Sequence, residues 1–429
     1  MIFTSAFIAA SLPFIAALPT PLKVSRGLPI PLSKRDAARR ADDGSLLTVC
    51  SKVHRGIAAY EVNTGATHSL ASLVSTPLVK RQAGSGGDIL TDDQQVLWFG
   101  TIQVGTPPVQ YTVDFDTGSS DLFLPGPTCG TTCSNHTVYN PASSSTSSDL
   151  GKTFSLAYGD GSTVSGKQFT DVVAISGSTA TNQTLGSANQ YSSGFQSPNF
   201  PADGLMGMGF PSISVYGANP VFQTLVASGV ITEPVFSFKL ATEGSELFIG
   251  GTDANLFTGN FTFVNVTQQG YWQVEMDALT VNGQNVIPIA QTSSIIDTGT
   301  TLIVGDTQTV ATAYRSIQGA TDNGDGTYTV PCNATPNLSL TFGGRSFSVD
   351  PATFILGSSS GATTGCIGGL SYNDAIAGQF WIIGDVFLQN VYTQFDVGKG
   401  QVGFAALSSS SIHEGVTCKI EVVDEVPRD

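Results

Sequence analysis

"VDFDTGSSDLFLPG", residues 113–126, has a near-copy in "SIIDTGTTLIVG", residues 294–305. In each stretch an apolar run ends at Asp-Thr-Gly, and hydroxyl side chains follow. One Asp-Thr-Gly is an ordinary turn sequence, because Asp and Gly both favour turns. Two copies in the same context indicate a duplication, and glycine lets the two loops approach closely. We therefore expect the carboxylates of Asp116 and Asp297 to face one another, although 181 residues separate them.

A second pair of similar stretches lies downstream of each Asp-Thr-Gly. "ADGLMGMGF" (202–210) and "FWIIGDVFL" (380–388) both run through apolar residues to a glycine. We expect each stretch to form the strand that packs beneath its own aspartate. The simplest consequence is a molecule of two equivalent lobes, each of which offers one carboxylate.

Composition limits the fold class. A chain of 429 residues is too long for one ordinary hydrophobic core, so two lobes are expected. The chain has 48 Gly and only 12% charged residues, and its short Val-, Ser- and Thr-rich runs are separated by turn residues. Such runs are typical of β-strands. The sequence therefore predicts an all-β protein.

The N-terminus has the features of an exported chain. Residues 1–18 are apolar and end in small residues, as a secretory signal peptide does, although no Lys or Arg precedes Lys23. A membrane anchor is the alternative, and Pro13 and the shortness of the apolar run disfavour it. We expect a secreted protein with no membrane partner.

Charge is distributed unevenly along the chain. Residues 1–81 hold 10 of the 18 Lys and Arg but only four acidic residues, whereas the rest holds 8 basic and 29 acidic residues. The boundary falls at the dibasic pair Lys80-Arg81, after which processing proteases could cut. We interpret residues 19–81 as a basic propeptide held by an acidic body. The alternative is a disordered basic tail. We disfavour it because a secreted protein has no nucleic acid for such a tail to bind.

Cysteines and sequons agree with export. We interpret two cysteine pairs as disulfides, Cys129–Cys133 and Cys332–Cys366. The alternative is a metal site, which the scattered positions of the four histidines disfavour. Cys50 would leave with the propeptide, so Cys418 would be a free thiol. No metal or other cofactor is expected. The Asn-X-Ser/Thr glycosylation sites begin at Asn135, Asn182, Asn260, Asn265, Asn333 and Asn337.

Two carboxylates in one site predict a particular chemistry. Like-charge repulsion raises the pKa of one carboxyl group while hydrogen bonding lowers that of the other, so the pair holds one proton over an acidic range. One carboxylate can then act as general base on a water while the protonated one polarises a carbonyl group. This is peptide hydrolysis without a covalent intermediate.

From about Gln82 to Leu407 the chain resembles the pepsin family of aspartic endopeptidases. Besides both Asp-Thr-Gly stretches, the resemblance includes "YGDGS" (158–162), "DGLMGMGFPSIS" (203–214), "GYWQ" (270–273), "FWIIGDVFLQNVYTQFD" (380–396) and "VGFA" (402–405). It implies a bilobal fold of two β-rich lobes related by a pseudo-twofold axis, here residues 82–258 and 259–407, with a polar tail at 408–429. An extended peptide would bind in the cleft between the lobes by strand-like hydrogen bonds.

The resemblance also implies roles for single residues. Asp116 and Asp297 would be the catalytic dyad. Ser119 and Thr300 would hydrogen-bond the outer side of each carboxylate, and Gly118 and Gly299 would keep the loops close. The substrate-binding residues implied by the resemblance are Tyr158 and Gly159 in a flap over the cleft, with Phe195 and Leu205 as walls of the S1 subsite, which holds the P1 residue. The two cysteine pairs match disulfides of the family.

Three residues depart from the common pattern or add to it. Phe123 stands where the family usually has Trp, and either the resting position of the flap tyrosine changes or the swap is a neutral core substitution. Asp114 lies two residues before Asp116 on the same strand face, and Asp160 lies in the flap. Some fungal members with acids at these positions accept Lys at P1. Alternatively, Asp160 is an ordinary turn residue and Asp114 a solvated or hydrogen-bonded strand acid.

The leading hypothesis is a fungal, secreted, monomeric endopeptidase that acts at acid pH and is made as a zymogen. Its partners would be polypeptide substrates with hydrophobic side chains at P1 and P1′, pepstatin-type inhibitors and its own propeptide. In the family a propeptide lysine commonly caps the dyad, and Lys34 and Lys52 are both candidates. The alternatives are a vacuolar processing protease and a catalytically silent relative that only binds.

Overall fold

The computed structural model describes residues 29–34, 40–41, 49–72, 91–92, 98–158, 161–197, 199–241, 244–287, 292–358, 365–373 and 380–408. Only the backbone is described for residues 29–34, 40–41, 49–54, 72, 91–92 and 358. The predicted signal peptide, Arg81, Cys418 and the tail after Ser408 lie outside the described residues. In the described part, β-strands far outnumber helices, as the composition predicts.

The strands that precede residue 250 are β1 (Pro29–Lys34), β2 (Arg40–Ala41), β3 (Thr91–Asp92), β4 (Trp98–Val104), β5 (Val109–Asp116), β6 (Leu122–Pro125), β7 (Ser148–Ala157), β8 (Thr163–Ile175), β9 (Ser178–Tyr191), β10 (Gly204–Gly207), β11 (Val235–Lys239) and β12 (Ser245–Ile249). The strands that follow are β13 (Phe257–Asn265), β14 (Gln268–Gln269), β15 (Trp272–Met276), β16 (Ala278–Val281), β17 (Gln284–Asn285), β18 (Thr292–Ile296), β19 (Ile303–Gly305), β20 (Thr321–Asp322), β21 (Tyr328–Val330), β22 (Leu338–Phe342), β23 (Arg345–Val349), β24 (Ile355–Ser358), β25 (Cys366–Gly368), β26 (Leu370–Tyr372), β27 (Trp381–Ile383), β28 (Val391–Asp396) and β29 (Gln401–Leu407).

The helices are short, apart from the first. The α-helices are α1 (Val49–Thr64), α2 (Val221–Ala227), α3 (Thr307–Arg315), α4 (Pro351–Phe354) and α5 (Asp385–Leu388). The 3₁₀ helices are η2 (Ser69–Ser72), η3 (Gly130–Cys133), η4 (Pro141–Ser143), η5 (Ser193–Phe195) and η6 (Pro211–Ile213).

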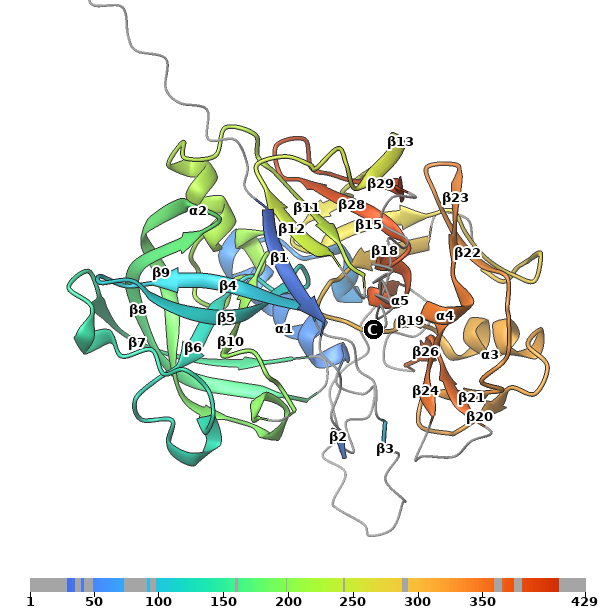
Figure 1. Ribbon diagram of the computed structural model, residues 1–429, viewed down its shortest axis with the longest axis horizontal. Coiled ribbons are helices and arrows are strands. Elements are labelled where there is room, and N and C mark those ends of the chain that lie inside the picture. Colours follow the sequence, from blue (N-terminus) through green and yellow to red (C-terminus); the bar gives the residue numbers. More distant parts are fainter. Residues whose placement is uncertain are drawn as a thin grey trace, which may run out of the picture.

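The strands form two lobes joined by one continuous sheet. A 13-stranded sheet runs in the order β13-β29-β28-β11-β12-β1-β4-β5-β10-β6-β9-β8-β7, so strands from both halves of the sequence share it. A six-stranded sheet, β14-β15-β18-β27-β19-β26, belongs to the second lobe. In Figure 1, β7, β8 and β9 lie on the left and β20 to β24 on the right, with α1 between them. The predicted two-lobed, all-β fold is confirmed.

The two Asp-Thr-Gly stretches are built in the same way. In the first lobe β10 lies between β5 and β6, parallel to β5, and Gly207 pairs with Asp116. In the second lobe β27 lies between β18 and β19, parallel to β18, and Ile383 pairs with Ile296. The strands predicted from the second repeated stretch therefore lie beside the strands that carry the aspartates.

Strand ends beside the loops are buried. Phe115 and Ile296, which directly precede the two aspartates, are 1% and 0% exposed. Apolar residues at the ends of β5 and β18 thus anchor each loop in the hydrophobic core. At about 25 cal/mol per Å² of buried apolar surface, each such side chain stabilises the fold by about 2–3 kcal/mol.

The segment of residues 49–72, here called the docked segment, packs against the body. Ile57 and Leu70 are buried in a cluster that includes Ile213 and Tyr271. At the end of α1, the Asn63 side-chain amide donates to the carbonyl oxygens of Ser212 (3.0 Å) and Ser214. A part of the predicted propeptide is therefore joined to both η6 and the start of β15.

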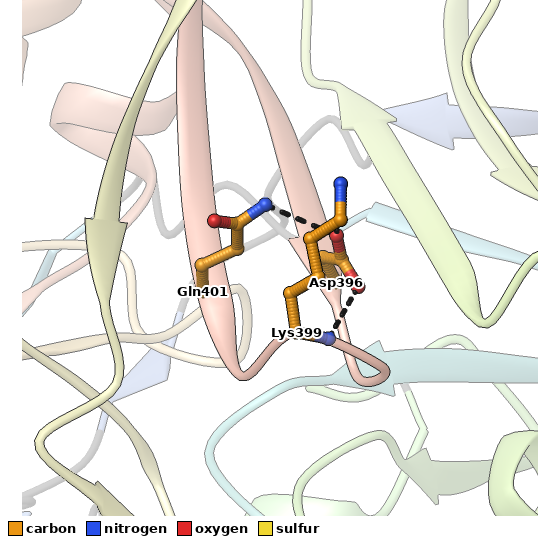
Figure 2. Close-up of polar contacts among 3 residues, drawn as sticks. All are labelled: Asp396, Lys399 and Gln401. Atoms are coloured by element: carbon orange, nitrogen blue, oxygen red, sulfur yellow. Dashed lines mark hydrogen bonds and ion pairs between the residues drawn. The ribbon is translucent and has the colours of Figure 1, made fainter.

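The carboxylate of Asp396 fixes the turn between β28 and β29. Figure 2 shows Lys399 and Gln401 converging on Asp396 at the β28–β29 turn. The Lys399 ammonium group lies 3.8 Å from the carboxylate and is well exposed, so this ion pair adds little stability. The Lys399 backbone N–H also donates to Asp396 at 2.8 Å and satisfies this nearly buried acid.

None of the helices in the described residues is long and apolar enough to span a membrane.

Candidate active site

The two Asp-Thr-Gly loops meet through their threonines. The hydroxyl group of Thr117 donates to the carbonyl oxygen of Ile296 at 2.9 Å, and that of Thr298 donates to Phe115 at 2.6 Å. Each hydroxyl oxygen also accepts the backbone N–H of the opposite threonine at 3.0 Å. All these groups are buried, so the loops are held in one fixed relation.

Each carboxylate is oriented by its own loop. Asp116 accepts the Gly118 N–H at 2.8 Å on one oxygen and the Ser119 hydroxyl at 2.6 Å on the other. Asp297 accepts the Gly299 N–H at 2.9 Å and the Thr300 hydroxyl at 2.7 Å in the same pattern. The matching bonds repeat the geometry across the two lobes, as the repeated sequence predicts.

The loop glycines lie directly against the opposite carboxylate. A Cβ built on Gly118 would lie 2.5 Å from the carboxyl carbon of Asp297, and one built on Gly299 would collide with Asp116. Any larger residue at either position would separate the loops. Asp116 and Asp297 are 1% and 2% exposed in this state. The structure therefore brings together the two carboxylates that the sequence predicted to face one another.

Strands β10 and β27 support the loops from behind. The Met208 N–H donates to the carbonyl oxygen of Asp116 at 2.8 Å, and the Asp297 N–H donates to that of Ile383 at 3.0 Å. The Ser120 hydroxyl group donates to Phe210, which ties the first loop to the chain after β10. Backbone positions beside both carboxylates are thus fixed by buried hydrogen bonds.

Tyr158 follows β7 and packs at the edge of the site. Its backbone forms a turn with Ser162, and its ring lies 5.0 Å from that of Phe195 and 5.9 Å from that of Phe123. Burial, followed by the charge of Asp116, raises the pKa of the Tyr158 hydroxyl well above its usual value, so the phenol is neutral. Gly159 and Asp160 lie outside the described residues.

The candidate S1 residues share an aromatic cluster. Phe195 in η5 and Leu205 in β10 are each 3% exposed and pack in one cluster with Phe123 and Tyr158. Phe123 is fully buried and lies 5.1 Å from the ring of Phe195. Asp114 is also buried, at a register position opposite Leu205, rather than solvated on the surface.

Sequence reasoning missed the residues of the docked segment that reach this site. The lining of the pocket beside the first loop consists of Arg55, Gly56, Gly118, Ser119, Ser120, Asp121, Leu156, Ala157, Tyr158, Ile213, Val215 and Tyr271. A Cβ on Gly56 would collide with the Tyr271 hydroxyl, so α1 packs directly on this phenol. "GYWQ" marked Tyr271 in the sequence, but nothing marked Arg55 or Gly56 as its neighbours.

The lysines proposed to cap the dyad are only partly described. Lys34 lies in β1 and Lys52 in α1, and the side chains of both are outside the described atoms. Arg55, also on α1, lines the pocket.

Asp121 is a further buried acid near the first loop. It accepts the Ser214 hydroxyl at 2.6 Å and the Val215 N–H at 2.8 Å. Burial nevertheless raises the pKa of this carboxyl group to about 6. Its hydrogen bonds to the η6 segment connect the Asp-Thr-Gly loop to the region on which α1 packs.

Both interpreted disulfides, Cys129–Cys133 and Cys332–Cys366, are present. The side chains of all six sequon asparagines are exposed, which is what glycosylation requires. Within the described ranges, no group of three or more His, Cys, Asp or Glu could hold a metal ion.

Comparisons with known proteins agree with this geometry. The family model of the eukaryotic aspartyl proteases matches residues 97–407. An aspartic protease of Phaffia rhodozyma is 43% identical over 333 residues, which cover 75% of this chain and 79% of that protein. Pepsin A of Rhinolophus ferrumequinum is 38% identical, covering 72% and 81%, and cathepsin E-B of Xenopus laevis is 37% identical, covering 74% and 81%. The chain therefore belongs to the eukaryotic aspartyl protease family.

Proposed function

We propose that this chain is an aspartic endopeptidase, made as a zymogen, in which Asp116 and Asp297 activate a water. The observation that carries the proposal is the meeting of the two loops: each glycine abuts the opposite carboxylate, and each carboxylate is held by an N–H and a hydroxyl group. Family membership supports the same activity.

The proposed mechanism needs only these side chains and a water. The dyad shares one proton, because two adjacent carboxylates do not both ionise at acid pH. The ionised carboxylate takes a proton from the water, whose oxygen attacks the peptide carbonyl carbon, while the protonated carboxyl group donates to the carbonyl oxygen. Proton transfer to the amide nitrogen then lets the C–N bond break, leaving a carboxylic acid and an amine.

The proposed substrates are extended polypeptides with a hydrophobic P1 residue. Phe195, Leu205 and Tyr158 lie in one apolar cluster, and this supports an apolar S1 subsite. Asp114 lies buried at the edge of that cluster, beside Leu205 in register. A buried carboxylate there favours a cation that reaches it, so Lys at P1 is part of the proposal.

We further propose that residues 19–81 inhibit the enzyme until they are removed after Arg81. The packing of Gly56 on Tyr271 and the position of Arg55 in the pocket support this. The N-terminal sequence favours export, and the alternative is a vacuolar location. Localisation of the tagged chain would distinguish the two. A silent relative would lack a dyad aspartate or the flap tyrosine, whereas Asp116, Asp297 and Tyr158 are all present.

The test is cleavage of an unfolded protein by the acid-activated full chain across about pH 2–7. We expect activity confined to acid, inhibition by pepstatin, and a loss of at least about 10³-fold in the Asp297→Asn variant. Asp325→Asn, in an exposed turn, is the matched control and should keep full activity. Equal activity of both variants would exclude the shared-proton dyad, and no activity of folded wild type at any pH would leave a protein that only binds.

Lys at P1 is tested with a pair of peptides that differ only in Phe or Lys at that position. Asp114→Asn should lower kcat/KM for the Lys peptide about 10-fold or more and leave the Phe peptide nearly unchanged, because it removes the charge and keeps the shape. An equal change for both peptides would mean that Asp114 has a structural role instead.

A further inference from the structure

His68 is enclosed where the docked segment meets the body. Its side chain is 1% exposed. The imidazole ring lies edge-on to the ring of Tyr60 on α1, at 4.8 Å, and to that of Tyr271 in the body, at 5.9 Å. A Cβ built on Gly270 would lie 3.0 Å from Nε2, so the backbone before β15 closes the third side. Both partners of the docking contact therefore surround this ring.

Hydrogen bonding selects the neutral form of His68. Nδ1 accepts the backbone N–H of Leu70 at 3.2 Å, so it carries no proton, and the ring proton lies on Nε2. Nε2 is buried without a hydrogen-bond partner. A second proton would go to Nδ1, end the bond from Leu70 and leave a buried cation with no acceptor. Such a group costs free energy unless it moves into water.

Among the described side chains around the ring, none supplies a charge that compensates a cation. The titratable side chains packed against the ring are those of Tyr60 and Tyr271, while the nearby side chains of Gln268 and Gln273 are neutral and bond to Ser69. Burial alone lowers the pKa of His68 from 6.5 to about 4.

The charged side chains that the structure describes on the packed elements are exposed. Arg55 and Glu61 on α1 and Glu275 on β15 are exposed to solvent, and η6 and β14 contain no charged residue. Asp116 and Asp297 act on the Tyr271 hydroxyl, whose pKa they raise after the larger effect of burial.

No ion pair holds residues 55–71 among the side chains that the structure describes. Among the described side chains, the ion pair of the structure is Lys399–Asp396 in the β28–β29 turn, far from residues 55–71 in the sequence. Docking there depends on apolar contacts, on Asn63 and on the pocket around His68. Among the described side chains of residues 55–71, the buried imidazole of His68 is therefore the group through which this contact can respond to pH.

We propose that His68 is an acid-sensitive switch: protonation of its imidazole expels the docked segment from the body and uncovers the site beside the dyad. The proposal rests on the zymogen function proposed above. An undocked segment lets the imidazole protonate near its ordinary pKa of 6.5, whereas docking holds it neutral until about pH 4. The undocked state binds more protons, so docking weakens as pH falls through this interval.

The experiment follows docking in the full-length chain with Asp297→Asn, which removes self-cleavage. Hydrogen-exchange protection of the amides of residues 57–70, relative to their intrinsic rates, is measured from pH 7 to pH 3.5. We expect protection to fall by up to tenfold per pH unit, about 80-fold between pH 6.5 and 4. His68→Asn, whose Oδ1 can replace Nδ1 as acceptor for Leu70 without titrating, should keep protection nearly constant.

His54→Asn, in the same segment, is the matched control, and its amide protection should fall with pH as it does in the parent chain. A parallel loss of protection in His68→Asn and in the parent would overturn the proposal, as would removal of the pH dependence by His54→Asn alone. If His68→Asn does not dock at pH 7, NMR titration of His68 in the parent chain decides. A midpoint near pH 6.5 while the segment stays protected would also overturn it. Absence of proteolysis in wild type would refute the proposed function without affecting these docking measurements.

Discussion

The hydroxyl groups of Thr117 and Thr298 join the loops through four buried hydrogen bonds of 3.0 Å or less. Thr117→Val keeps the side-chain shape but removes the donor to Ile296 and the acceptor for the Thr298 N–H. Leaving buried partners unsatisfied should cost about 2–4 kcal/mol of the free energy of unfolding. We also expect kcat to fall at least about tenfold, because small displacements of catalytic groups are costly.

Thr117→Ser is the control, since it retains the hydroxyl group. Urea unfolding and peptide hydrolysis compare the two variants. If Val and Ser lower stability and kcat equally, the hydroxyl bonds between the loops do not position the dyad.

At this scale the sequence predicts the site well where the interactions are local. Asp116, Ser119, Asp297 and Thr300 lie within three residues of their partners, so a repeated short motif is enough to indicate them. The bonds between Thr117 and Thr298 cross 181 positions and were not predicted. The signal was present, because both motifs contain threonine at the middle position.

Among elements, β10 and β27 were predictable and the docking of α1 was not. The two strands are apolar runs that recur at equivalent places, and each pairs with the strand carrying its aspartate. Helix α1 has no such repeat, and its contact depends on Ile57 meeting Ile213, which lies far along the chain. Basic charge indicated a propeptide held by acids, whereas the described contact is largely apolar.

Apolar burial in the docked segment gives a prediction for this element. Leu70 is 1% exposed, whereas Val62, eight residues earlier, is 84% exposed. Leu70→Ala should weaken docking by about 2–5 kcal/mol, because it removes buried methyl groups and leaves a cavity. Val62→Ala should change docking by less than about 0.5 kcal/mol.

Limited proteolysis of the full-length Asp297→Asn chain at pH 7 measures both variants. The cleavage rate within residues 49–72 should rise for Leu70→Ala only. Equal rates for the two variants would mean that the hydrophobic cluster does not hold the segment.

For the molecule as a whole, acidity and stability are linked. The chain carries a formal net charge of −15 at neutral pH, and its acidic residues are concentrated after residue 81. The fold disfavours the ionised form of two of these acidic residues, Asp121 and Glu246. Burial raises the pKa of Asp121 to about 6, and burial followed by the charge of Asp253 raises that of Glu246 to about 7. Both groups favour the folded state when protonated.

The sign of the pH dependence follows from these shifts. A carboxyl group with a raised folded-state pKa contributes stability below its ordinary pKa, and that contribution is lost as pH rises through the folded value. For Glu246 the interval runs from about pH 4.5 to about pH 7. The fold should therefore weaken toward neutral pH, in the direction opposite to acid denaturation.

Glu246→Gln isolates this effect, because the amide has nearly the same shape and does not titrate. Glu246 lies in β12 beside β11 and β1, and its Oε1 is buried without a hydrogen-bond partner. Between pH 4.5 and 7.5 the free energy of unfolding should fall by about 1–2 kcal/mol less in Glu246→Gln than in the parent chain, after allowance for partial exposure. Urea unfolding of both in the Asp297→Asn background measures the difference. Glu275→Gln, exposed on β15, is the control, and its free energy of unfolding should fall with pH as much as that of the parent. A fall as small as that of Glu246→Gln would attribute the effect to net charge rather than to the buried Glu246 carboxyl group.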